Sequence, residues 1–124
     1  MQQVGYLEKG DINNLGNLPS HVTYRRPTVL FVHADWCPHC KVMKPTYEDL
    51  AKKHSSMFSF RAIKADGDES EKHLMKDVKK LDPDFTGFPW IGYFKSDGTY
   101  VGTKPERDAK GIVKNLNNIL KTEG

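Results

Sequence analysis

The sequence predicts an α/β fold in which a central mixed β-sheet lies between layers of helices. Residues 29–32 form a continuous apolar run rich in β-branched side chains, which is typical of a strand covered on both faces. From Thr28 onwards, strand-like and helix-like patterns alternate along the chain. The last two predicted strands flank Asp97-Gly98, a strong hairpin signal. A strand–helix alternation that ends in a hairpin favours parallel and antiparallel strands in one sheet.

Length and composition indicate one soluble domain. The chain has 124 residues, of which 37% are hydrophobic and 28% are charged, and this length can bury a core without disulfide staples. No apolar stretch approaches the ~20 residues of a membrane span, so we expect no membrane partner. The net charge of +3 is spread over several segments, and Arg25-Arg26 and Lys79-Lys80 are interpreted as solvated surface, not as a nucleic-acid site. We expect a monomer.

The chain divides into a lead-in, residues 1–27, and a domain, residues 28–124. The lead-in is rich in Gly and Asn and is predicted to be irregular or partly helical; lid, extra strand and tail all remain open as its role. Its start lacks the basic-then-apolar order of a secretion signal, which favours a cytoplasmic location. A signal peptide that had been removed would leave the same pattern, and one cysteine pair fits either redox environment.

Two helices and a strand are predicted after the central strand. Residues 57–63 read as a strand, and Asp82-Pro83 ends the helix that follows, because a residue before proline avoids the helical region. The apolar positions of that helix recur at three-to-four spacing: Leu74, Met75, Val78 and Leu81. The helix after the central strand has a predicted buried stripe of the same kind: Val42, Met43, Thr46, Tyr47, Leu50 and Ala51.

The chain is expected to end in a hairpin and an amphipathic helix. The hairpin strands are residues 90–94 and 99–101, and Asp108 is placed to cap the final helix. One face of that helix carries Ala109, Ile112, Val113, Leu116, Ile119 and Leu120.

The chemistry is predicted to reside in Cys37 and Cys40, the two cysteines of the chain. They lie where the central strand ends and a helix begins. Because only two residues separate them, the two thiols can form and break a disulfide with each other. Pro38 suits the first helical position, where its missing amide has no intrahelical partner to lose. Trp36 is expected to shield the sulfurs and to offer a flat apolar surface to a partner chain.

A free thiol with a pKa of ~8.5 is only about 3% ionised at neutral pH, whereas the thiolate is the reactive form. The helix N-terminus and a proton donor or positive charge on His39 are expected to stabilise the thiolate of Cys37. Lowering a pKa by about two units requires roughly 2.7 kcal/mol. Cys37 is therefore predicted to attack, and Cys40, one turn further on, to resolve the resulting mixed disulfide.

The cysteine pair has two other interpretations, a structural crosslink and a metal site. A purely structural disulfide would close a ring so short that it stabilises by only about 2 kcal/mol. A metal site could use Cys37, Cys40 and His39, with His33 as a further candidate ligand, but zinc sites usually draw on a second ligand pair that this chain lacks. We therefore expect no metal and no organic cofactor. For His33, which ends the central strand, packing is favoured over a place at the border of the site.

Two segments resemble the thioredoxin superfamily, and the likeness covers roughly residues 28–121. The first is Ala34-Asp35-Trp36-Cys37 with Cys40-Lys41 and Pro45, and the second is the run from Gly87-Phe88-Pro89-Trp90 to Asp97-Gly98. The resemblance implies that Pro89 is a cis proline facing the cysteines. It also implies that the Phe88 backbone pairs with an extended substrate segment and that Phe88, Pro89, Trp90 and Trp36 line the substrate groove. Arg107 is similar in position to an isomerase arginine that favours ionisation of the second cysteine; a surface role is the alternative.

The chain departs from the family pattern at one buried position. The family has a carboxylate six residues before the first cysteine, where it accepts a proton from the second one, and this chain has Phe31 there. The Cys40 thiol must therefore lose its proton in a different way. Water or Arg107 could compensate for the missing carboxylate, or resolution by Cys40 could be slow. The Pro38-His39 pair is similar to that of the bacterial periplasmic disulfide oxidant, which suggests a more oxidising couple than that of thioredoxin.

The leading hypothesis is a thiol-disulfide oxidoreductase that acts on protein thiols and disulfides together with a reductase or oxidase partner. A protein-binding module that uses the aromatic groove without turnover, and a Cys/His metal-handling protein, are the alternatives. The net direction of electron flow, the substrate and the electron donor or acceptor stay open.

Overall fold

The computed structural model describes residues 4–123, so residues 1–3 of the expected lead-in and residue 124 of the expected domain lie outside it. Five strands form one sheet in the order β1-β3-β2-β4-β5. β1 (Gly5–Tyr6), β3 (Ser59–Lys64) and β2 (Thr28–His33) are parallel, whereas β4 (Trp90–Phe94) and β5 (Tyr100–Thr103) are antiparallel to their neighbours. The predicted mixed sheet is confirmed, and β2 lies at its centre with every residue buried.

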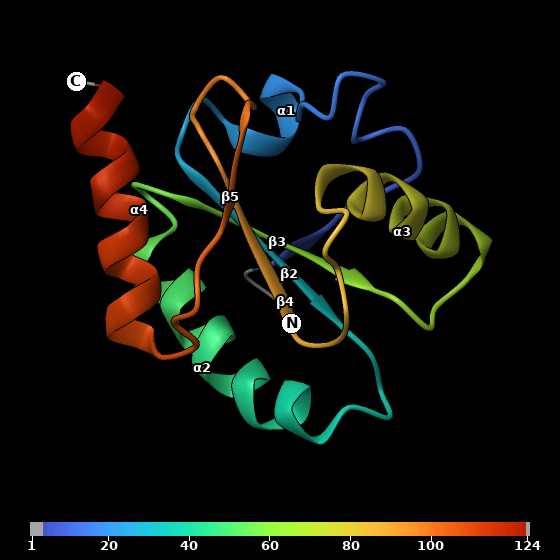
Figure 1. Cartoon of the computed structure of the whole chain (residues 1–124). Helices are drawn as coiled ribbons and strands as arrows, with labels where there is room; N and C mark the ends of the chain where they lie inside the picture. Colours follow the sequence, from blue (N-terminus) through green and yellow to red (C-terminus); the bar gives the residue numbers. More distant parts are fainter. Residues whose placement is uncertain (1–3, 124) are drawn as a thin grey trace.

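Helices cover both faces of this sheet (Figure 1). α2 (Pro38–His54) and α4 (Ala109–Glu123) lie on one face, and α3 (Glu69–Leu81) lies on the other with the short α1 (Ser20–Thr23). Because side chains alternate along a strand, β2 contributes to two separate cores. Val29 and Phe31 pack under α2 and α4, whereas Leu30 and Val32 pack under α3. Among residues 4–123, no helix is both long and apolar enough to cross a bilayer.

The lead-in packs against the domain at several points. β1 adds an edge strand beside β3, and the Leu7 amide donates to the Ala62 carbonyl at 3.0 Å. Leu18 donates to the Gly98 carbonyl at 2.9 Å, and a Cβ on Gly98, whose φ is +92°, would collide with the Leu18 backbone. Residues 5–6 form an extra strand, which is one of the three roles left open for the lead-in. The division of the chain into a lead-in and a domain at residue 27 stays a prediction.

Several predicted boundaries and burials need correction. The strand predicted at 57–63 begins at Ser59, because the Met57 and Phe58 amides bond the His54 carbonyl in a turn that ends α2. Val42 was placed in a buried stripe, but it is 77% exposed. In α4, Leu120 is 37% exposed, whereas Asn115 is buried and donates to the Tyr93 hydroxyl at 3.2 Å. At Asn115, a hydrogen bond to a neighbouring strand therefore outweighs the apolar periodicity of the helix.

Candidate functional site

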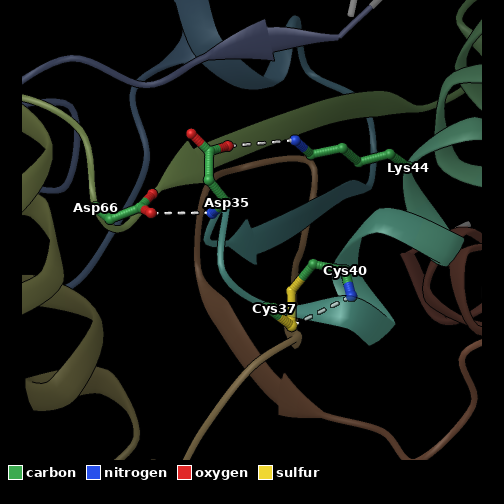
Figure 2. Close-up of a disulfide and its surroundings, with 5 residues drawn as sticks. All are labelled: Asp35, Cys37, Cys40, Lys44 and Asp66. Carbon is green, nitrogen blue, oxygen red and sulfur yellow. Dashed lines mark hydrogen bonds and ion pairs between the residues drawn. A yellow bond between two sulfur atoms is a disulfide. The ribbon is translucent and has the colours of Figure 1, made fainter.

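The two cysteines meet at the N-terminus of α2. Cys37 is the N-cap residue, Pro38 is the first helical residue as predicted, and a disulfide joins Cys37 to Cys40 with 5.2 Å between their Cα atoms (Figure 2). The Cys40 amide donates to Cys37 Sγ at 3.2 Å, so the sulfur occupies the place of a capping oxygen. The Cys40 amide and the dipole of α2 therefore favour negative charge on this sulfur when the disulfide opens.

The strand before the helix fixes the position of Cys37. The Cys37 amide donates to the carbonyl of Ala34 at 3.1 Å, and Ala34 directly follows the end of β2 at His33. Cys37 is 2% exposed and Cys40 is fully buried in the core under α2. The two residues thus differ in their helix position more than in their exposure.

A cleft of about 570 Å³ runs between the start of α2 and the start of α4. It brings together three residues predicted for the site, since His39, Pro89 and Arg107 all line it. Exposed Val42 lines it as well. The remaining lining residues are Met43, Thr46, Asp108 and Ala109. An apolar cleft with a cation at its edge, next to a disulfide, can hold a segment of a partner chain.

Trp36, which directly precedes Cys37, contacts the segment that carries Pro89. The Phe88–Pro89 peptide bond is cis, as the resemblance implied. The Trp36 ring is 66% exposed and contacts the Phe88 ring edge-on with centroids 5.4 Å apart. Trp90 is more deeply buried: it is 5% exposed in the core under α3, and its Nε1 donates to Asp82 at 2.8 Å. The Phe85 ring contacts both the Trp90 ring and the Phe88 ring. Of the four residues predicted for the substrate groove, Trp36 is exposed, Phe88 and Pro89 are half-buried, and Trp90 is buried.

Charged groups that the sequence analysis missed hold the loop before Cys37. The Asp35 carboxylate lies 2.9 Å from Lys64 Nζ. It also lies 3.9 Å from Lys44 Nζ, and the Asp35 amide donates to Asp66 at 3.0 Å (Figure 2). The hydrogen bond from Lys64 lowers the pKa of Asp35. Asp35 follows β2 and Asp66 follows β3, and these neighbouring strands are parallel. The sequence signal for this cluster was the pair of acidic residues, Asp35 and Asp66, that lie just beyond the ends of β2 and β3.

Phe31 occupies the position where the family carries a carboxylate, and its ring is fully buried. It stacks on His33 at 5.1 Å between ring centroids and contacts Tyr47 of α2 at 4.9 Å. His33 is fully buried, which agrees with the packing that the sequence favoured. His21 and His73 are exposed and His54 is half-buried, away from this cluster.

Metal ligands were a further possibility for this site. Over residues 4–123, no group of three or more His, Cys, Asp or Glu side chains is arranged to hold a metal ion. Two electrons can instead be stored in the Cys37–Cys40 bond itself.

A mixed sheet lies between helices, a disulfide caps one of them, and a cis proline lines a cleft with residues of that helix. These features define a thioredoxin-fold protein with a redox-active cysteine pair. The sequence pattern of the thioredoxin family matches residues 14–118. The chain belongs to the thioredoxin family.

Curated relatives agree with this assignment. The chain is 31% identical to a thioredoxin-like protein of Invertebrate iridescent virus 6 over 94% of this chain and 89% of that protein. It is 34% identical to a protein disulfide-isomerase of Medicago sativa over 82% of this chain, but it spans only 20% of the length of that relative.

Solved structures show the same fold. The first thioredoxin domain of mouse protein disulfide-isomerase A4 has a TM-score of 0.69 and 24% identity, covering 96% of this chain and 76% of that one. Spinach chloroplast thioredoxin f, in its short form, has a TM-score of 0.66 and 20% identity, covering 94% and 92%. A thioredoxin f2 in complex with ferredoxin:thioredoxin reductase has a TM-score of 0.64 and 19% identity, covering 94% of each chain.

Proposed function

We propose that this protein is a thiol-disulfide oxidoreductase that acts on protein substrates through Cys37 and Cys40. The observation that carries the proposal is the disulfide at the N-terminus of α2, with Cys37 Sγ accepting the Cys40 amide. A sulfur in this position is stabilised as a thiolate, and the thiolate is the nucleophile of disulfide exchange.

In the reductive direction, the Cys37 thiolate attacks one sulfur of a substrate disulfide. A bond forms between Cys37 and that sulfur, and the other substrate sulfur leaves as a thiolate. The Cys40 thiolate then attacks Cys37, forms the Cys37–Cys40 disulfide and releases the second substrate thiolate. The substrate gains two electrons and the protein loses them; oxidation of a substrate runs the same steps backwards.

Cys37 is assigned the attack because it is the N-cap residue of α2, whereas Cys40 lies inside the first turn of the helix. The cleft lined by Pro89, His39 and Arg107 supports a protein substrate lying beside the cysteines. Exposed Trp36 against Phe88 supports an apolar or aromatic contact with that substrate. A reductase or oxidase is the partner that would regenerate the cysteine pair, and the Pro38-His39 pair favours a couple more oxidising than that of thioredoxin.

Reduction of insulin by dithiothreitol, followed as turbidity, tests the activity. We expect the protein to accelerate precipitation and the Cys37→Ser variant to give the rate of dithiothreitol alone. The Cys40→Ser variant should trap substrates as mixed disulfides on Cys37, whereas Cys37→Ser should trap almost none. Equal trapping by both variants would refute the assigned roles. Wild-type protein that neither accelerates precipitation nor traps a partner would favour a binding module without turnover.

A further inference from the structure

A second cavity lies at the end of α2 that is far from the cysteines. It has a volume of about 370 Å³ and is lined in part by Ser55, the C-cap residue of α2, whereas Cys37 is the N-cap residue. The start of β1, the turn between α1 and β2, and β3 supply its other walls. α2 has 17 residues, so at about 1.5 Å per residue roughly 25 Å of helix separates the cavity from the disulfide. The cavity is therefore separate from the redox site.

Two arginines from different elements line this cavity. Arg26 lies in the turn before β2 and Arg61 lies in β3, and both are half-buried. The ion pairs among residues 4–123 are formed by lysines and by His21, so neither guanidinium has a carboxylate partner within that part of the chain. Because an arginine keeps its charge in proteins, the cavity carries two positive charges that no acidic side chain of the described residues neutralises.

Main-chain carbonyls hold both guanidiniums in place. Arg26 Nη1 donates to the Ser55 carbonyl at 2.6 Å, and Arg61 Nε donates to the Val22 carbonyl at 2.9 Å. A Cβ on Gly5 would collide with Arg61 Nη1, so the missing side chain on β1 makes room for the guanidinium. A guanidinium has five N–H donors. These contacts therefore fix each arginine and leave other donors available to a ligand.

The Tyr24 ring contacts both arginines. Its centroid lies 6.0 Å from Arg26 Cζ and 5.4 Å from Arg61 Cζ, which is the range of cation–π contacts. Tyr24 also lines the cavity and is 61% exposed. The ring thus holds two like charges beside one cavity, and a ligand can reach it from solvent.

The backbone that carries this ring is strained. Tyr24 and Arg25 have φ values of 52° and 57°, in the left-handed region that residues other than glycine rarely adopt. Tyr24 is the C-cap residue of α1, and a left-handed residue at the end of a helix is usually glycine. Strained residues of this kind cluster at ligand sites. Glycine at position 24 would relieve the strain, but it would remove the ring that contacts the two arginines.

We propose that this cavity is a binding site for a small phosphate monoester. The phosphate group contacts the Arg26 and Arg61 guanidiniums, and the organic group packs on the Tyr24 ring. Two unneutralised cations complement the nearly dianionic charge of a phosphate monoester near pH 7, and the planar guanidinium fork matches phosphate oxygens. A volume of about 370 Å³ is in the range of small-molecule sites. The site is independent of the proposed oxidoreductase function.

Binding is first measured on the oxidised wild-type protein. Phenyl phosphate is added at constant ionic strength while the side-chain Nε–H signals of the arginines are followed by nuclear magnetic resonance. We expect the Arg26 and Arg61 signals to shift along one saturable curve and the signals of Arg25 and Arg107 to shift little. Shifts confined to Arg107, or no saturable shift at Arg26 and Arg61, would overturn the site.

Two further probes test the charge and the source of the ligand. Benzenesulfonate has the same ring with one negative charge, and it should bind about 10-fold more weakly than phenyl phosphate, because one guanidinium charge stays uncompensated. Equal affinities would refute the assignment of a dianion. A short phosphoserine peptide carries the phosphate group on a protein chain, and tighter binding of this peptide than of phenyl phosphate would refute the assignment of a small molecule.

Isothermal titration calorimetry compares variants that neutralise one cation at a time. Arg26→Gln and Arg61→Gln should each weaken phenyl phosphate binding by roughly 10-fold, because each removes charge-assisted hydrogen bonds. Arg25→Gln is the matched control: Arg25 is exposed and is not among the lining residues, so its loss should change the affinity by less than about threefold. Equal losses in all three variants would show attraction to net charge alone and would overturn the site. If Arg61→Gln does not fold, as judged by circular dichroism, the comparison of Arg26→Gln with Arg25→Gln decides.

A pair of glycine variants separates the ring from the strain. Tyr24→Gly and Arg25→Gly each place glycine at a left-handed position, so neither should lower the urea midpoint of unfolding. Only Tyr24→Gly should weaken phenyl phosphate binding, by about 10-fold, because it removes the ring that holds both cations. A Tyr24→Gly variant that is destabilised yet binds phenyl phosphate like the wild type would show that the ring serves stability, and would overturn its place in the site.

Discussion

The two faces of the sheet are packed with different chemistry. Under α3, the core is built mainly from aliphatic side chains such as Leu30, Ile63 and Leu74, which form few directed contacts. Under α2 and α4, the core contains both cysteines together with buried hydroxyl and imidazole groups, including Tyr47 and His33. Apolar packing tolerates changes in detail, whereas buried polar groups need defined partners. The difference teaches that one face chiefly stabilises the fold and the other face positions reactive groups.

The largest change in stability is expected from the α3 face. Leu74 is fully buried, and Leu74→Ala should lower the free energy of unfolding by about 2–5 kcal/mol through lost burial and a residual cavity. Urea unfolding measures this loss. The rate of Cys37 alkylation in the reduced, folded variant should match that of the wild type, because Leu74 lies on the other side of the sheet from the cysteines. A changed alkylation rate would contradict the separation of the two faces.

A pH-dependent loss of stability is expected from the α2 face. The pKa of His33 is about 4 in the folded protein and near 6.5 when unfolded, so between these values the unfolded chain binds more protons. Stability from this residue is present above pH 6.5 and falls as the pH drops towards 4, by up to about 3 kcal/mol. Urea unfolding at several pH values should show this slope in the wild type and a shallower slope in His33→Gln. Parallel slopes would show that His33 does not titrate in this way.

A smaller effect is expected from a buried hydroxyl on the same face. Tyr47 Oη lies 2.9 Å from the Val29 carbonyl and 2.7 Å from the Arg61 carbonyl, so its single proton is shared between β2 and β3. Tyr47→Phe keeps the ring and removes this link, which should cost roughly 1–3 kcal/mol. Thermal unfolding measures the cost, and Tyr93→Phe, which loses the contact with Asn115, is the matched comparison. A Tyr47→Phe variant as stable as the wild type would show that the hydroxyl contributes nothing.

Much of the architecture could be predicted from local patterns. The central strand, the antiparallel hairpin and the start of α2 at Pro38 all agree with the sequence prediction. Asp108 caps α4 as expected, accepting the Gly111 amide at 3.0 Å. These features depend on residues close together in the chain, where period, turn chemistry and capping act directly.

The errors arose where distant segments compete with local patterns. Val42 fits an apolar stripe by spacing, but it faces the cleft between α2 and α4. Asp35, Lys64 and Asp66 come together because β2 and β3 are parallel neighbours, which a single sequence does not state. Tyr6 reaches His33 across 27 residues because β1 and β2 both pair with β3.

The sequence by itself determined the local chemistry: two thiols with two residues between them, a proline after the first thiol that starts a helix, and an apolar strand that leads to this segment. The tertiary structure alone decided which groups surround those thiols, including the cleft shared by Pro89 and Arg107 and the contact between Tyr6 and His33. The physical reason is the range of the interactions. Helix capping and side-chain period act within a few residues, whereas strand order and sheet register bring together residues that lie far apart in the chain.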